Sequence, residues 1–458
     1  MNKKHLTTIL IFLSVLMWGQ NIKFNIKYSE PLAVFIFMQN LSDNYPDNVF
    51  KAEFQKSKYN NDNYKKLIEK FDNLAIDYSY QFEGFPYGSK ARMQTRDVLK
   101  KNLIETNTLN DFKLRSIGIL PNNVLNDLTA CITSFTPIYN ELIYQPNKEQ
   151  FEKQLAEIKD YSNNNQLDDY FEKGLIFYNS SWDQSIPFEI AFYPFPESDY
   201  FNAQAFYNNF VSAIQTDLKD YKDLFSVMMH ETYHIIYNEQ TLEFKSQIDE
   251  AFKKNPSKSS NYAYLLMNEV LATALGNGYV YEKLNNGKPD VNDWYFHEYI
   301  NLMSRKIYPL VKEYITEKKA IDKSFIDQYI QLYETNFPNW INEPDNIMTY
   351  RYIISENKDD LTTIRRKFRY RSMEENESEI SSGSIDTMKK TPLTKIIIIS
   401  KDSPQKLNLI KSKFTELKKW NYSSDKEFVQ KFLLDDKSQL IIINQKKSSL
   451  DKLLTMIK

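Results

Sequence analysis

The sequence predicts a helix-dominated α+β protein, and three observations lead to this prediction. Residues 63–75, 148–159 and 324–340 place apolar residues at helical spacing beside charged faces. Residues 188–214 contain short aromatic and β-branched runs that are typical of strands. Residues 393–458 alternate strand-like and helix-like segments, which predicts a small parallel α/β module. Glycine is scarce, at 9 residues, whereas Tyr and Phe number 32 and 30, as expected for an aromatic-rich helical protein.

The first 20 residues have the pattern of a secretory signal peptide. Lys3 and Lys4 precede an uncharged apolar run over 6–18, which ends at a small and polar exit with cleavage near Gly19 or Gln20. This run is too short to remain as a membrane-spanning helix. We therefore expect an exported protein, secreted or periplasmic, with no stable membrane insertion after cleavage.

Residues 21–185 are expected to form a mainly helical N-terminal region to which the sequence assigns no chemistry. Within it, 32–37 suits either a strand or a helix. The runs 188–195, 203–207 and 210–214 are predicted strands that open a core region over 186–345. The helix that follows these strands carries the most informative motif of the chain.

That motif is His230-Glu231-Thr232-Tyr233-His234, set among apolar residues in a chain with only 4 His. On a helix, His230 and His234 lie one turn apart on the same face, where two imidazoles can hold a metal ion. Glu231 lies about 100° further round, within reach of a water on the metal but badly placed to ligate it with both histidines. Glu231 is therefore the candidate general base. The alternative is a core helix whose histidines bond backbone carbonyls.

The motif resembles the zinc metallopeptidases that carry His-Glu-x-x-His, the zincins. Tyr237 and Gln240 stand where the metzincin branch has Gly and His, so that branch is excluded. The chain is more similar to the gluzincin, or thermolysin-like, branch, whose third ligand is a glutamate on a downstream helix. This resemblance implies Glu269 as the third ligand, because it lies in an apolar helix that opens after Ser259. A lone carboxylate in such a helix is costly to bury unless it is paired or bound to a metal. Three rivals lack comparable apolar surroundings: Glu239, Glu243 and Glu250.

The predicted Glu269 helix is expected to stop at Gly276-Asn277-Gly278. Thr273 follows Glu269 by one turn, where thermolysin-like enzymes place a polar residue that orients a ligand histidine. Simple helix packing is the equal alternative for Thr273.

The resemblance also implies a histidine or tyrosine that stabilises an oxyanion. His297, the remaining histidine of the mature chain, and Tyr308 are the candidates, with Tyr299 as an alternative. In gluzincins the edge strand of a small sheet pairs with an extended peptide. Residues 203–207 or 210–214 are the candidates for that strand, or belong to a purely structural hairpin. No substrate-binding side chain is predicted.

The C-terminal part is expected to consist of a connecting segment, 346–392, and a small α/β accessory module, 393–458. The Ser-rich, charged stretch 371–392 is predicted to be a flexible linker. The module has strands at 395–400 and 440–443 and lacks a Gly-rich phosphate loop. We interpret it as a packing module.

The charge of the chain argues against a nucleic-acid partner, and its cysteine content excludes an internal disulfide. A net charge of −2 and a pI near 6.2 give no basic footprint, so a nucleic-acid partner is not expected. The single cysteine, Cys131, excludes an internal disulfide.

The sequence thus leads to the hypothesis of an exported metallopeptidase with one Zn2+ held by His230, His234 and Glu269, and with water activated by Glu231. The ligand set favours zinc over manganese or cobalt. Two alternatives stay open: a zinc hydrolase of a non-peptide amide or ester, and a non-catalytic zinc-binding scaffold protein. The expected partner is a peptide or protein substrate of undefined sequence, and the oligomeric state is left open.

Overall fold

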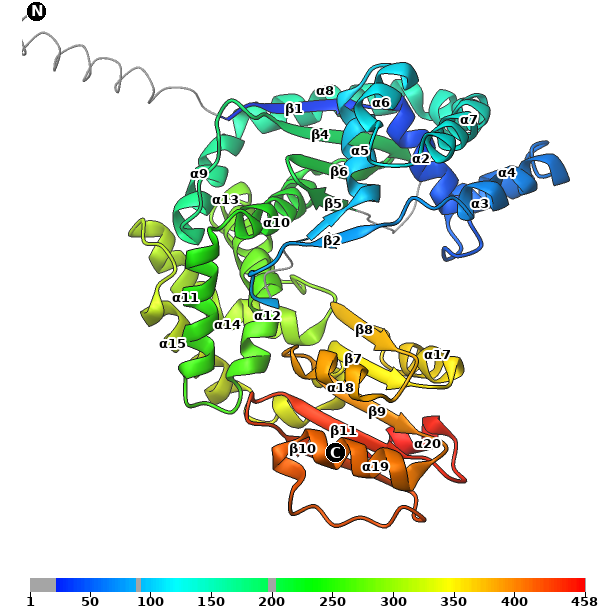
Figure 1. Cartoon of the computed structure of the whole chain (residues 1–458). Coiled ribbons are helices and arrows are strands. Elements are labelled where there is room, and N and C mark those ends of the chain that lie inside the picture. Colours follow the sequence, from blue (N-terminus) through cyan, green and yellow to red (C-terminus); the bar gives the residue numbers. More distant parts are fainter. Residues whose placement is uncertain (1–21, 88–91, 197–202, 458) are drawn as a thin grey trace, which may run out of the picture. The chain divides into compact units, whose positions relative to one another are not determined.

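The computed structural model describes residues 22–87, 92–196 and 203–457, so the predicted signal peptide lies outside the described residues. The fold is helix-dominated α+β, as predicted, with small sheets among the helices (Figure 1). The chain divides into two compact units. Unit 1 comprises residues 1–83, 91–240 and 275–290, and unit 2 comprises residues 84–90, 241–274 and 291–458.

Unit 1 is built on a four-stranded sheet with the order β1-β4-β6-β5. β1 (Phe24–Tyr28) and β6 (Asn209–Gln215) lie parallel to β4 (Phe188–Phe195), whereas β5 (Ala203–Phe206) pairs antiparallel with β6. The predicted strands are thus present, and β5 is the edge strand while β6 lies inside the sheet. Because β1 joins the same sheet, the predicted division at residue 185 does not coincide with a structural boundary.

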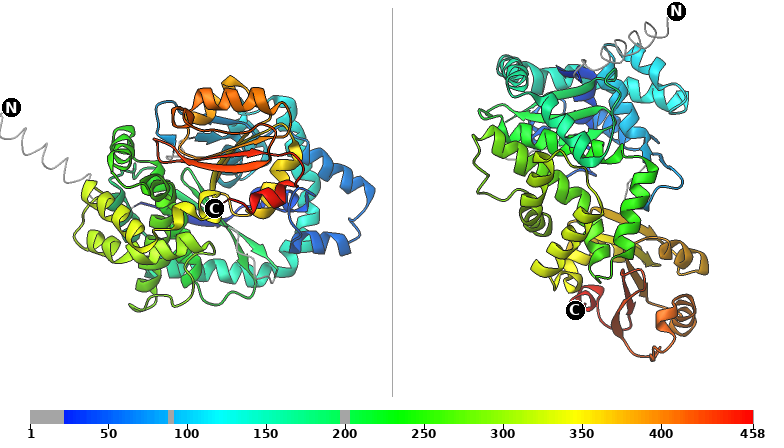
Figure 2. Two further views of the ribbon diagram at one scale, coloured as in Figure 1. Left: turned by 90° about the horizontal axis from the view of Figure 1, so that it is seen from below. Right: turned by 90° about the vertical axis from the view of Figure 1, so that its left-hand side faces the viewer.

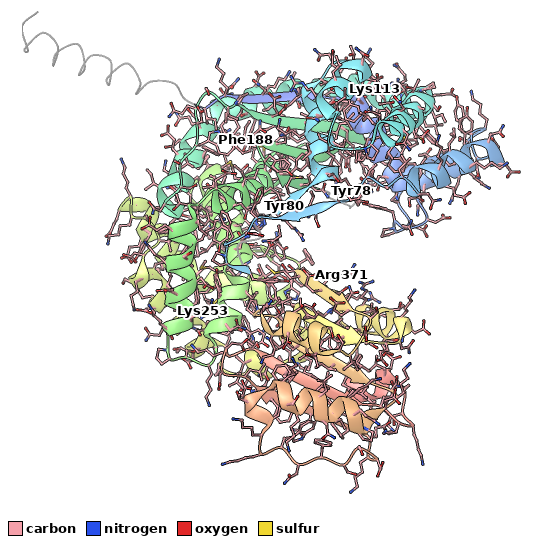
Figure 3. All side chains as sticks on the ribbon, in the orientation of Figure 1. Tyr78, Tyr80, Lys113, Phe188, Lys253 and Arg371 are labelled. Carbon is pink, nitrogen blue, oxygen red and sulfur yellow. The ribbon has the colours of Figure 1, made fainter. Side chains whose placement is uncertain are left out.

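All eight residues of β4, which begins at Phe188 (Figure 3), are buried, because helices cover both faces of this central strand. Ala191, Tyr193 and Phe195 belong to a hydrophobic core shared with α2 (Glu30–Leu41) and α7 (Asn122–Tyr139). Residues 32–37 are therefore helical, since they lie inside α2.

The remaining helices of unit 1 flank this core. They are α3 (Val49–Lys56), α4 (Asp62–Asp72), α5 (Thr95–Glu105), α6 (Leu109–Ser116), α8 (Gln145–Asn164), α9 (Leu167–Tyr178), α10 (Lys222–Asn238) and α13 (Tyr281–Leu284), with π-helical η2 (Asn140–Tyr144) and η3 (Ala274–Val280). A separate hairpin pairs β2 (Ser79–Gln81) with β3 (Arg92–Gln94).

Unit 2 contains a group of packed helices followed by an α/β sheet, seen from two further directions in Figure 2. The helices are α11 (Leu242–Lys254), α12 (Ser260–Thr273), α14 (Glu298–Thr316) and α15 (Lys323–Asn336), then the short η4 (Trp340–Asn342) and α16 (Pro344–Ile347).

The second sheet has the order β10-β11-β9-β7-β8, in which β11, β9, β7 and β8 are parallel. Its elements are β7 (Tyr350–Ser355), α17 (Lys358–Lys367), β8 (Met373–Glu377), α18 (Ser382–Lys389), β9 (Thr394–Ile399), α19 (Ser403–Lys413), η5 (Thr415–Leu417), β10 (Phe428–Leu433), β11 (Gln439–Asn444) and α20 (Leu450–Leu454). The predicted parallel strands β9 and β11 are present. The antiparallel strand β10 was not expected.

The predicted linker over 371–392 is wrong, because this stretch forms β8 and α18. The acidic residues that suggested a mobile loop belong to an edge strand, where charge is usual. Glu374 on β8 also accepts hydrogen bonds from the buried Arg351, at 2.7 Å, and from Arg365, at 2.7 Å. The serines form a capping box, in which Ser381 and Ser384 satisfy the first backbone groups of α18.

In the part of the chain that the structure describes, no helix combines the length and apolar character needed to cross a membrane.

Candidate metal centre

The helix α10 carries the His-Glu-x-x-His motif and presents it along one side. Most of its apolar residues are buried, which explains why the segment is helical and fixed in place. Val227, Glu231 and His234 are partly exposed and follow one another at spacings of four and three residues, so they share a face. His230 is buried beside this face, with 5% of its surface exposed.

The two imidazoles of α10 converge through their Nε2 atoms. His230 Nε2 and His234 Nε2 lie 3.1 Å apart, and the rings are nearly perpendicular, at 83°. Two nitrogens that bind one tetrahedral zinc at 2.0–2.1 Å are separated by about 3.3 Å. The observed separation therefore suits two ligands of one metal ion.

Asn277 fixes the orientation of the His230 ring. Its Oδ1 atom lies 3.1 Å from His230 Nδ1, and because an amide oxygen only accepts, Nδ1 carries the proton and donates it. The Nε2 lone pair then points toward His234, as metal binding requires. The sequence did not reveal this role, because Asn277 was expected to end a helix.

The predicted stop at Gly276-Asn277-Gly278 is wrong. α12 continues without interruption into η3 and α13, so the helical segment runs from Ser260 to Leu284. In a π-helix the backbone is wider, which inserts an extra residue into the turn and is common at functional sites. Here it turns the Asn277 amide toward His230.

Two glycines allow other helices to approach α10 closely. A Cβ atom at Gly276 would lie 2.6 Å from the backbone nitrogen of His230. A Cβ atom at Gly174, on α9, would lie 2.5 Å from the ring of Tyr233, whose hydroxyl donates to the Tyr170 carbonyl. Only glycine permits both approaches, so these contacts hold α10 in position.

Glu269, the predicted third ligand, lies on α12, seven residues before Gly276 in the same continuous helical segment. The ligand atoms of His230, His234 and Glu269 all lie within 4.8 Å of one another. The three predicted rivals are exposed and belong to no such group of described residues: Glu239, Glu243 and Glu250.

Contacts inside unit 2 anchor α12. Ser304 Oγ, on α14, donates to the Val270 carbonyl at 3.1 Å, and the Tyr262 hydroxyl lies 2.8 Å from Thr394 Oγ1 on β9. These bonds join α12 both to its neighbouring helix and to the α/β sheet. The sheet therefore supports the helix that carries Glu269.

Two tyrosines that sequence reasoning missed lie beside Glu269. The Tyr295 hydroxyl donates toward Glu269 Oε2 at 3.4 Å, and the Tyr370 hydroxyl lies 3.4 Å from the Tyr295 hydroxyl. Burial and the charge of Glu269 raise the pKa of Tyr370 far above its ordinary value, so it stays protonated. With 32 Tyr in the chain, no sequence signal singled these two out.

The predicted oxyanion candidates have other neighbours. His297 stacks on the Tyr370 ring at 3.8 Å, and burial lowers its pKa to about 4. Tyr308 packs against the edge of Trp294 at 5.1 Å. The Tyr299 hydroxyl donates to Glu343 at 2.7 Å. Tyr295 is therefore the tyrosine that the structure places at the carboxylate of Glu269.

Thr273 is fully buried, and its hydroxyl has no hydrogen-bond partner. The predicted bond from Thr273 to a ligand histidine is thus not formed, and Asn277, one turn further along, makes that bond instead.

Comparisons of the chain with protein-family models, with curated proteins and with solved structures gave no match.

Proposed function

We propose that the chain is an exported zinc-dependent metallopeptidase of the gluzincin type. The observation that carries the proposal is the pair of Nε2 atoms 3.1 Å apart, with Asn277 setting the protonation of His230. Glu269 completes a donor set of two imidazoles and one carboxylate, which is the set used by hydrolytic zinc sites.

The residues around this donor set have separate tasks in peptide hydrolysis. Zinc would supply a Lewis acid that lowers the pKa of a coordinated water toward neutrality. Glu231, on the partly exposed face of α10, takes the proton of the attacking water and passes it to the leaving amine nitrogen. Tyr295 donates a hydrogen bond to the carbonyl oxygen as it gains negative charge.

The edge strand β5 favours a peptide as the substrate. It packs beside α10, pairs on one side with β6 and has no second partner strand among the described residues. An extended peptide can add to such an edge through its backbone, with little demand on side chains. The resemblance to gluzincins assigns the same task to this strand.

The test is a Glu231→Gln variant of the mature chain, residues 21–458, assayed against a peptide library. We expect about one zinc per chain in parent and variant, with peptide hydrolysis in the parent and a loss of at least 10²-fold in the variant. Equal hydrolysis by both proteins would contradict the proposal. Hydrolysis of esters or cell-wall amides, but of no peptide, would assign the same residues to a non-peptide substrate.

A further inference from the structure

The strand β2 and the residues beside it alternate aromatic with polar side chains, and the aromatic side chains are exposed instead of packed against the rest of the protein. Tyr80 lies on β2, and Tyr78 and Phe82 lie directly before and after the strand, so the three occur at every second position and share one face of this extended segment. This face is exposed, at 52%, 55% and 46% of the three side chains, and Figure 3 marks Tyr78 and Tyr80 on it. Tyr80 and Phe82 contact each other edge to face at 5.4 Å. An alternating aromatic strand normally buries such a face.

The backbone of β2 is also available on one edge. The Thr95 amide donates to the Tyr78 carbonyl at 2.9 Å, which identifies the pair Tyr78–Thr95 as hydrogen-bonded. Because such pairs alternate along an antiparallel ladder, Ser79 and Gln81 direct their N–H and C=O groups away from β3. Among the described residues, β2 has no strand partner other than β3.

The hairpin is tied to the strand that lies beside α10. The backbone N–H of Gln94 donates to the Tyr207 hydroxyl, and that hydroxyl lies 3.3 Å from the backbone carbonyl oxygen of Gln94. Lys100, on the helix that follows β3, donates to Gln204 on β5 at 2.7 Å. All these elements belong to unit 1. The aromatic face is thus fixed beside β5 and is not an isolated loop.

We infer that β2 is a docking strand for an extended polypeptide, the substrate of the proposed peptidase, and this inference rests on that proposed function. The outward backbone groups of Ser79 and Gln81 pair with the polypeptide, while the aromatic face takes its apolar side chains, which recur at the same two-residue spacing.

The experiment measures binding without catalysis. The full mature chain carrying Glu231→Gln is titrated into a fluorescein-labelled 12-residue peptide in which Phe or Val alternates with Ser or Thr, and anisotropy is recorded. A peptide with proline at alternate positions, which cannot pair as a strand, serves as the peptide control. We expect binding of the first peptide, and Kd at least about tenfold weaker for the proline peptide.

Two variants locate the binding surface. The double variant Tyr80→Ser/Phe82→Ser is expected to raise Kd about tenfold or more. The control Leu114→Ser, which changes an exposed apolar residue on α6, is expected to leave Kd unchanged. Gln81→Pro, which removes an outward N–H, should weaken binding more than Gln81→Ala does. Circular dichroism confirms that the variants are folded.

Unchanged Kd in the folded Tyr80→Ser/Phe82→Ser variant would overturn the inference. It would also be overturned by a concentration-dependent dimer that this variant abolishes, because the face would then bind a second copy. The two proposals fail separately. Peptide binding at β2 without hydrolysis by the parent would contradict the peptidase, and hydrolysis with unaltered binding in the hairpin variants would contradict the docking strand.

Discussion

At the residue scale, the chemistry depends on side chains that orient the candidate ligands. For the proposed zinc site, His230 needs its proton on Nδ1 and its lone pair on Nε2, and the Asn277 amide oxygen favours that state from 3.1 Å. Glu269 faces the hydroxyl of Tyr295, which in turn lies beside that of Tyr370. Each of these partners can be removed with a small change of volume.

Asn277→Ala removes the acceptor for His230 Nδ1. We expect zinc affinity to fall about 10- to 100-fold, because the imidazole is then free to rotate and to exchange tautomers. Competition with a chromophoric chelator measures this. Asn285→Ala is the matched control, since Asn285, also near this segment, accepts from Lys222 instead. Equal zinc affinity in Asn277→Ala and the parent would show that the bond does not orient a ligand.

Tyr295→Phe removes one hydroxyl beside Glu269. We expect kcat/KM to fall about 10²- to 10³-fold, the usual effect of losing an oxyanion donor, while zinc content stays at the parent value. Tyr299→Phe is the control, because that hydroxyl bonds Glu343. If Tyr295→Phe instead lost zinc and kept its activity once zinc was restored, Tyr295 would act only as a support for Glu269.

His297 is expected to make the free energy of unfolding of the protein depend on pH. Burial lowers its pKa to about 4, below the ordinary value of 6.5, so the folded protein resists a protonation that the unfolded chain accepts. The associated stability is present above pH 6.5 and is lost as the pH falls toward 4. Because the ring is partly exposed, we expect the parent to lose about 1 kcal/mol more than His297→Phe between pH 7 and pH 5. Urea unfolding at both pH values measures this, and parallel losses in the two proteins would contradict it.

At the element scale, the sequence predicted the helices and strands whose apolar residues recur at regular spacing. It missed the elements whose conformation depends on tertiary contacts. The motif helix, the strands β4, β5 and β6, and the parallel strands β9 and β11 could be predicted from apolar patterns. The continuation of α12 into η3 could not, because the glycine that suggested a stop is required by the close approach of His230. β8 escaped prediction because an edge strand with acidic residues has the composition of a loop.

Gly276→Ala tests that close approach. A methyl group 2.6 Å from the His230 backbone nitrogen forces η3 and α10 apart. We expect a loss of about 1–3 kcal/mol in the free energy of unfolding, together with weaker zinc binding. Gly383→Ala is the control, because its nearest neighbour would be 3.9 Å away, and there a helical alanine should be neutral or stabilising. Urea denaturation compares the two, and equal stabilities would show that the helices adjust freely.

At the scale of the whole molecule, the sequence predicted the helix-dominated α+β class, because long helical segments and two groups of short strands are local properties. It did not predict how these segments divide into units. β1 joins a strand more than 150 residues away, and the continuous helical segment 260–284 begins in unit 2 and ends in unit 1. Such pairings depend on contacts between residues that are distant in the sequence, and the spacing of apolar residues within one segment does not predict them. The His-Glu-x-x-His motif, by contrast, is local, so the sequence predicted that His230, Glu231 and His234 lie on one helix.

The central claim is that His230, His234 and Glu269 hold one zinc ion. The most direct test is the metal content of the mature chain beside Glu269→Ala, with Glu243→Ala as the control for an exposed glutamate of the same region. We predict about one zinc per chain in the parent and in Glu243→Ala, and a large loss in Glu269→Ala. Full zinc content in Glu269→Ala, or no zinc in any of the three proteins after zinc is supplied, would contradict the account.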